Sequence, residues 1–242
     1  MLFRPFRSFT FGFFLPLSAA KLIARKKSLL ILSALPIGIT LALYWFLIQS
    51  LQDWAKAGIH DLIQKLGMDP NGWLAWLTAL TFGLVLILVS AVTFAFSSSI
   101  VASPFNDLLA EKTENFSTPV IRSETKITWR RQLQLIGIDL LKALAVGVAS
   151  VTALLLSWVP VLNFFAFALM FYLMTFQYIS YPQTRRGIGL LKGAQFIVLH
   201  PFASLGFGLS ISLLFAVPLL GGFVLPLAVV GGTLLFAACE KH

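Results

Sequence analysis

Four long stretches of this chain contain no Asp, Glu, Lys or Arg, which limits the folds that it can adopt. Each stretch is rich in apolar residues, and a helix needs about 20 of these to cross a membrane. Only 11% of all residues are charged, against about 25% in soluble domains. The sequence therefore predicts an all-α integral membrane protein, with residues 1–242 in one membrane domain. The four tracts are residues 28–52, 70–106, 143–184 and 201–239.

The first two tracts predict two long transmembrane helices. Residues 28–52 are enough to span a hydrocarbon core of ~30 Å. Residues 70–106 would reach roughly 55 Å as one helix, so we expect that helix to tilt or to protrude from the membrane. Residues 53–69 between them are expected to form an external loop.

The last two tracts carry helix-breaking residues near their middles. Pro160 divides residues 143–184, and the segment VPLLGGFVLP divides residues 201–239. Each arm then has about 16–20 residues, at or below the length that spans a membrane comfortably. We expect two helical hairpins that turn at these prolines and glycines and are re-entrant. Two ordinary pairs of spanning helices are the alternative interpretation.

Residues 1–27 combine an apolar stretch with basic residues at both ends. This pattern predicts an N-terminal amphipathic helix at the membrane interface, with Phe9, Phe13 and Leu17 on its membrane face. A signal peptide is the alternative, but the basic cluster at Arg25 leads directly into the next apolar tract.

The distribution of Lys and Arg predicts the orientation of the chain. Residues 1–27 and 107–142 hold six each and residues 185–200 hold three, whereas residues 53–69 hold only two. Basic loops favour the cytoplasmic side, so we expect both termini in the cytoplasm, together with an amphipathic segment over 107–142. The net charge of +9 then fits anionic lipid headgroups rather than nucleic acid.

The segment SPFNDLLAEK, residues 103–112, places carboxylates at the end of the second tract. Pro104 predicts a break or kink, with Ser103 capping a new helix. Asp107 and Glu111 lie four residues apart and share one helix face. We expect them to organise a basic vestibule by pairing with cations; a solvated helix with surface salt bridges is the alternative. The candidate cations are Arg130, Arg131 and Lys142.

Nothing in the chain predicts an enzyme, a metal or another cofactor. Cys239 is the only cysteine, and His60, His200 and His242 lack the spacing of metal ligands. No nucleophile elbow or phosphate-binding loop occurs.

The Pro-Phe-Asn block before Leu-Leu-Ala-Glu resembles the CysZ-type sulfate permease family, bacterial inner-membrane proteins related to etoposide-induced membrane proteins. The similarity extends over nearly the whole chain. Further matching residues are Arg130-Arg131, Lys142, Pro160, Gln177-Tyr178, Tyr181-Pro182, Pro218-Leu219-Leu220 and Gly231-Gly232-Thr233.

This resemblance implies sulfate uptake across the bacterial inner membrane for cysteine biosynthesis and sulfur assimilation, without an ATP-binding domain. It also implies two long membrane helices, two hairpins of partial depth, and a homo-oligomer, either a dimer or an oligomer of dimers. A transporter of another small oxyanion, such as sulfite, and a non-transporting scaffold that binds a partner are the alternatives.

Family members carry a Gly-x-Arg-Arg-like sulfate-binding element before the first membrane helix, where this chain has Ala24-Arg25-Lys26-Lys27. Lys presents a point charge rather than the bidentate fork of Arg. Ser180 replaces an Asp of some members. We expect Arg25, Lys26 and Lys27 to bind sulfate. The expected pore or vestibule residues are Asn106, Glu111, Arg130, Arg131, Lys142 and Gln177.

Overall fold

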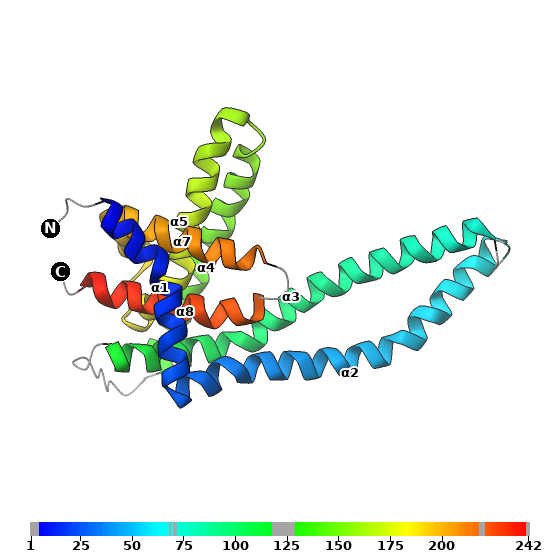
Figure 1. Ribbon diagram of the computed structural model, residues 1–242, viewed down its shortest axis with the longest axis horizontal. Helices are drawn as coiled ribbons and strands as arrows, with labels where there is room; N and C mark the ends of the chain where they lie inside the picture. Colours follow the sequence, from blue (N-terminus) through cyan, green and yellow to red (C-terminus); the bar gives the residue numbers. More distant parts are fainter. Residues whose placement is uncertain (1–4, 68, 70–71, 118–128, 218–220, 241–242) are drawn as a thin grey trace. The chain divides into compact units, whose positions relative to one another are not determined.

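The computed structural model describes residues 5–67, 69, 72–117, 129–217 and 221–240 (Figure 1). These residues form eight α-helices and no strand, which confirms the predicted all-α class. The helices are α1 (Pro5–Arg25), α2 (Lys27–Lys65), α3 (Trp73–Ser117), α4 (Trp129–Leu156), α5 (Pro160–Arg185), α6 (Leu190–Leu199), α7 (Pro201–Phe215) and α8 (Gly221–Glu240).

Several helices are long and apolar enough to cross a membrane. Four of them pass this test singly, and α6 and α7 pass it together although they are bent by 98° at His200. The protein is therefore a multi-pass integral membrane protein. The four single spans are Lys27–Phe46, Leu133–Leu156, Pro160–Arg185 and Phe223–Glu240.

The first two long helices extend beyond the predicted tracts. α2 continues from Lys27 to Lys65, so most of the expected external loop is helical. α3 is uninterrupted at Pro104, and the predicted break with a new cap at Ser103 is wrong. A break in an apolar environment would leave several backbone groups without partners, which costs more than the one hydrogen bond that proline removes.

The chain divides into two compact units, of which the second comprises residues 34–105. In this unit α2 and α3 form a helical hairpin, in which the Tyr44 hydroxyl donates a hydrogen bond to the Ser90 carbonyl. Two residues after the end of α2, Gly67 has a φ of 63°, which suits glycine, and its N–H bonds the Gln64 carbonyl.

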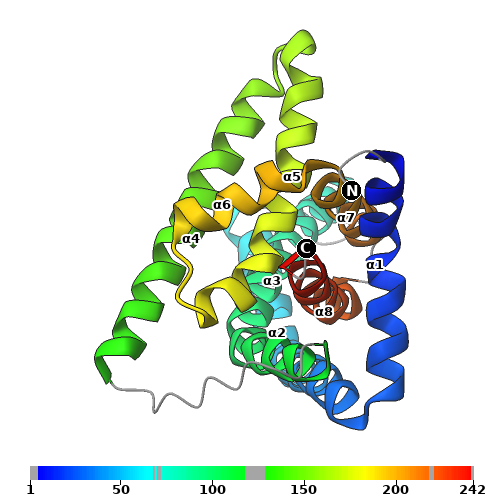
Figure 2. The ribbon, with the colours of Figure 1, turned by 90° about the vertical axis from the view of Figure 1, so that its left-hand side faces the viewer.

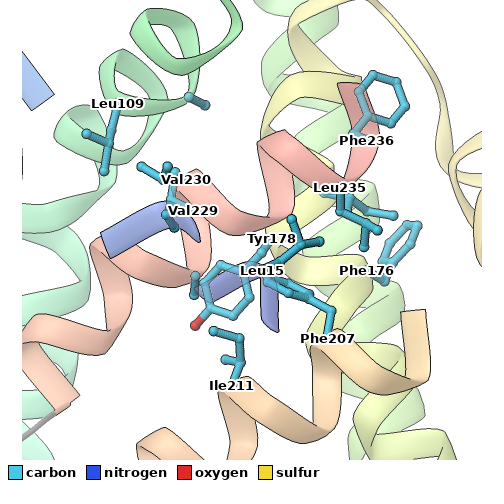
Figure 3. Packing of buried hydrophobic residues seen from close by; sticks show 14 of the residues in the cluster. Leu15, Leu109, Phe176, Tyr178, Phe207, Ile211, Val229, Val230, Leu235 and Phe236 are labelled. Carbon is cyan, nitrogen blue, oxygen red and sulfur yellow. The ribbon is translucent and has the colours of Figure 1, made fainter. Parts of the chain in front are cut away.

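The first unit, residues 1–33 and 106–242, contains the main hydrophobic core. Helix α1 packs on α7 and α8, and α5 packs on the same two helices. Figure 3 shows side chains from α1, α3, α5, α7 and α8 that meet in this core. Phe207, Ile179 and Leu235 are fully buried there.

Helix α1 is amphipathic, as predicted, and its other face packs into the core. Its buried residues are Gly12, Leu15, Pro16 and Ala19, which face the core, while Phe9 and Phe13 are partly buried. The buried face contacts α7 through Gly12, and the membrane face at Phe9, Phe13 and Leu17 stays a prediction. Exposed apolar residues remain at Phe6, Phe11, Phe14 and Leu17.

The close approach of α1 and α7 depends on two glycines. A Cβ at Gly12 would overlap the carbonyl of Ala203, and one at Gly206 would overlap that of Phe9. Since backbone atoms cannot yield as a side-chain end does, we expect Gly12→Ala to destabilise the protein by about 2 kcal/mol. The measurement is thermal unfolding in detergent. Gly147→Ala is the control, because a Cβ there meets no atom within 4 Å; equal melting temperatures for both variants would contradict this packing.

Tract three forms a hairpin with longer arms than expected. The turn lies at residues 157–159, and Pro160 occupies the first turn of α5, as predicted. However, α4 begins at Trp129, so the arms have 28 and 26 residues. Charge predicts a boundary at Lys142, yet α4 continues through this residue and buries it. Re-entrant insertion stays a prediction.

Tract four forms two helices, α7 and α8, and the short helix α6 precedes it. α6 contacts α4 and α5 and crosses them (Figure 2), and the bend at His200 then leads into α7. Pro226, expected in the hairpin turn, lies inside α8. The turn residues 218–220 lie outside the described part of the chain.

Candidate functional site

Two consecutive arginines at the end of α5 bind the carboxylates of α3 and α8. Arg185 Nη1 lies 3.0 Å from Glu111 Oε2 and 3.4 Å from Asp107 Oδ2. Arg186 Nη2 lies 2.8 Å from Glu114 Oε1, and its Nη1 also donates to Glu240. We call these residues the arginine cluster: Asp107, Glu111, Glu114, Arg185, Arg186 and Glu240.

Acids outnumber bases in the arginine cluster. Partial burial raises the pKa of Asp107 and of Glu114, although the neighbouring guanidinium groups act in the opposite direction. Both arginines are committed to carboxylates. The cluster can therefore fix α5 against α3 and α8, but it offers no free positive charge to an anion.

The cluster corrects part of the predicted vestibule. Asp107 and Glu111 do pair with arginine, but with Arg185 rather than with Lys142. Arg130 and Arg131 lie in the first turn of α4, and their side chains are outside the described residues. Sequence reasoning treated Arg185 only as an orientation signal; its position directly after an apolar tract was the available indication.

Lys142 is the most buried cation of the described chain, with 2% of its surface exposed. Its ammonium group donates to Gln183 Oε1 at 3.3 Å and to Thr184 Oγ1 at 3.2 Å. Both acceptors are uncharged, and no described carboxylate lies within 4 Å of this ammonium. Gln183 in turn donates to the Gly193 carbonyl of α6. Lys142 therefore lies in a polar contact among α4, α5 and α6.

Of the remaining predicted vestibule residues, one is buried and one is exposed. Asn106 is 5% exposed and donates to the Tyr181 hydroxyl at 3.3 Å. Gln177 is exposed on α5 and does not join this group. Gln183, six residues later, is the buried glutamine that sequence reasoning missed. No cluster of three or more His, Cys, Asp or Glu in the described ranges could hold a metal ion.

The predicted sulfate-binding residues lie where α1 ends and α2 begins. Arg25 closes α1, Lys27 opens α2, and all three cations of the Arg25–Lys27 cluster are exposed. Within the described residues no carboxylate lies within 4 Å of any of them. The positive end of the α2 dipole lies at the same place. This cluster can therefore attract an anion without first breaking an ion pair.

Comparison with known proteins gives consistent matches. The family model for the sulfate transporter CysZ and etoposide-induced protein 2.4 matches residues 15–226. Three relatives are each named sulfate transporter CysZ. That of Pectobacterium atrosepticum is 27% identical, covering 80% of this chain and 71% of its own length. That of Pseudomonas fluorescens is 27% identical, and the match covers 83% of this chain and 82% of the relative's length. That of Pseudomonas paraeruginosa is 28% identical, and the match covers 85% of this chain and 86% of the relative's length.

Proposed function

Because the chain belongs to the family of the sulfate transporter CysZ and etoposide-induced protein 2.4, we propose that it is a sulfate permease. It carries sulfate across the bacterial inner membrane and supplies cysteine biosynthesis, with no enzymatic step and no cofactor. The observation that carries this proposal is the Arg25–Lys27 cluster at the start of the first membrane helix, three exposed cations with no carboxylate within 4 Å among the described residues.

Sulfate is a dianion with a high cost of dehydration. A conducting protein needs positive charge at the entrance and weak, repeated contacts further along. The Arg25–Lys27 cluster supplies the first requirement. Lys142 supplies a cation further along, and its neutral partners Gln183 and Thr184 can exchange for an anion at a smaller electrostatic cost than a carboxylate could.

The other pore candidates have different roles in this proposal. Asn106 adds a neutral donor, which is held by Tyr181. Glu111 pairs with Arg185, so it affects the anion path indirectly, by way of the arginine cluster. Arg130, Arg131 and Gln177 remain candidates for the path between the two cation sites.

The alternatives make different demands on the same residues. A transporter of sulfite or another small oxyanion would need the Arg25–Lys27 cluster but would prefer a different anion. A non-transporting scaffold would tolerate neutralisation of these cations. Radiolabelled sulfate flux into liposomes that contain only this protein tests the proposal, with unlabelled sulfite, nitrate and phosphate as competitors. Absence of flux above that of empty liposomes would refute it.

The proposed orientation has both termini in the cytoplasm, with a homo-oligomer in the membrane. Single cysteines at Gly58 and Gly189, in a Cys239→Ser background, are expected to react with an impermeant thiol reagent from opposite sides, because basic segments stay cytoplasmic. A Cβ is accommodated at both positions. Labelling is measured in intact and in permeabilised cells. Reaction of both cysteines from the outside of intact cells would contradict this orientation.

A further inference from the structure

The side chain of Lys26 lies over an aromatic ring from another helix. Its ammonium nitrogen is 4.8 Å from the ring centroid of Phe116, which belongs to the last turn of α3. The ring is 42% exposed. Neither Arg25 nor Lys27 has such a contact within the described chain. Within the described residues, Lys26 is therefore the member of the Arg25–Lys27 cluster whose ammonium group lies over an aromatic ring.

The backbone on both sides of this contact is well anchored. The Lys26 carbonyl accepts hydrogen bonds from the N–H groups of Leu29 and Leu30, and its own N–H bonds the Leu22 carbonyl. On α3, Thr113 is fully buried and the Glu114 carboxylate binds Arg186. Phe116 lies two residues after Glu114 in the same turn of α3, so the arginine cluster fixes the turn that presents the ring.

An aromatic ring holds a cation in a way that a carboxylate does not. The negative face of the ring attracts the ammonium group, but the ring has no net charge. Arg185 and Arg186 are held by carboxylates, which cancel their charge toward an incoming anion. Lys26 is held in place and still keeps its full positive charge.

We propose that Phe116 is a positioning residue for the anion site, which holds the Lys26 ammonium group beside the start of α2 in a place where a tetrahedral dianion binds. This inference rests on the proposed sulfate permease function. It adds a residue from α3 to a site that the sequence placed only at the α1–α2 junction, and it connects that site to the arginine cluster.

The test uses the purified full-length protein with Phe116→Leu, which removes the ring face but keeps an apolar side chain, and Phe116→Trp, which strengthens the ring face. Sulfate binding is measured with radiolabelled sulfate. We expect Phe116→Leu to weaken binding about threefold with an unchanged melting temperature, and Phe116→Trp to bind at least as well as the wild type. Phe6→Leu, an exposed α1 residue, is the control and is expected to have no effect.

A double-mutant comparison separates positioning from general damage. In a Lys26→Met background, Phe116→Leu is expected to cause no further loss of binding, because the ring then has no cation to hold. An equal loss in both backgrounds, or wild-type binding by Phe116→Leu, would overturn the proposal.

A second measurement does not depend on sulfate. Reductive methylation with ¹³C keeps the charge of lysine, and the Lys26 methyl resonance is expected to shift in Phe116→Leu because the ring current is lost. If that shift occurs but the wild type binds no sulfate, the sulfate permease function fails while the Lys26–Phe116 pairing stands. If the resonance is unchanged, the pairing itself is refuted.

Discussion

Replacing Lys26 and Lys27 together by alanine is expected to lower sulfate binding and uptake at least about tenfold, while the protein still inserts and assembles. At an effective dielectric near 20, two unit charges 4 Å apart interact by about 4 kcal/mol before desolvation is subtracted. A net loss of only ~1.4 kcal/mol weakens binding tenfold. Both side chains are exposed, so their removal leaves no cavity in the core. Radiolabelled sulfate binding and flux into liposomes are measured side by side.

The matched control removes the same amount of charge elsewhere. Lys56→Ala with Lys65→Ala neutralises two exposed cations of α2, one of which is paired with Asp61, and it is expected to leave binding unchanged. Wild-type flux in the Lys26→Ala, Lys27→Ala protein would return these residues to a role in membrane orientation. An equal loss in the control would indicate a general effect of net charge.

The long apolar tracts were sufficient to predict the helical class and the position of the turn before Pro160. Pro160 begins α5 because its fixed φ and missing N–H suit a first helical turn. The ends of the long helices were predicted less well. α2 continues to Lys65 through charged residues, because exposed Lys and Asp side chains do not oppose a helix, and here Lys65 pairs with Asp61 one turn away.

The partners of the polar residues could not be predicted from local pattern. Gln177 and Gln183 lie six residues apart, so at about 100° per residue they project from different faces of α5. Hydropathy alone does not say which face meets α4 and α6. Tertiary packing buries Gln183 beside Lys142 and leaves Gln177 exposed.

The contact between α1 and α7 could not be predicted from hydrophobicity. Gly12 and Gly206 permit the contact between α1 and α7, yet an interpretation based on hydrophobicity gives glycine little weight. Hydropathy predicts the membrane face of α1 from Phe9, Phe13 and Leu17, but it does not identify the face that packs on α7 through Gly12.

Replacing Lys142 by methionine is expected to lower sulfate flux at least about tenfold without lowering the stability of the protein. A buried ammonium group with only neutral acceptors is costly to maintain, so an apolar side chain of similar length relieves that cost. Thr184 can turn its hydroxyl toward a carbonyl of its own helix, as Thr175 and Ser180 do. Gln183 keeps its hydrogen bond to Gly193. Liposome flux and thermal unfolding are measured on the same preparation.

The two readouts separate transport from folding. If Lys142 served only to hold α4 against α5, the methionine variant would lose stability, and flux would fall only in proportion to the folded fraction. If Lys142 meets the anion, stability is kept or increased while flux falls, because the cation that would replace part of the hydration shell is gone. Lys192→Met, an exposed cation on α6, is the control and is expected to keep both properties. Normal flux in Lys142→Met would exclude Lys142 from the path and leave the Arg25–Lys27 cluster as the anion site.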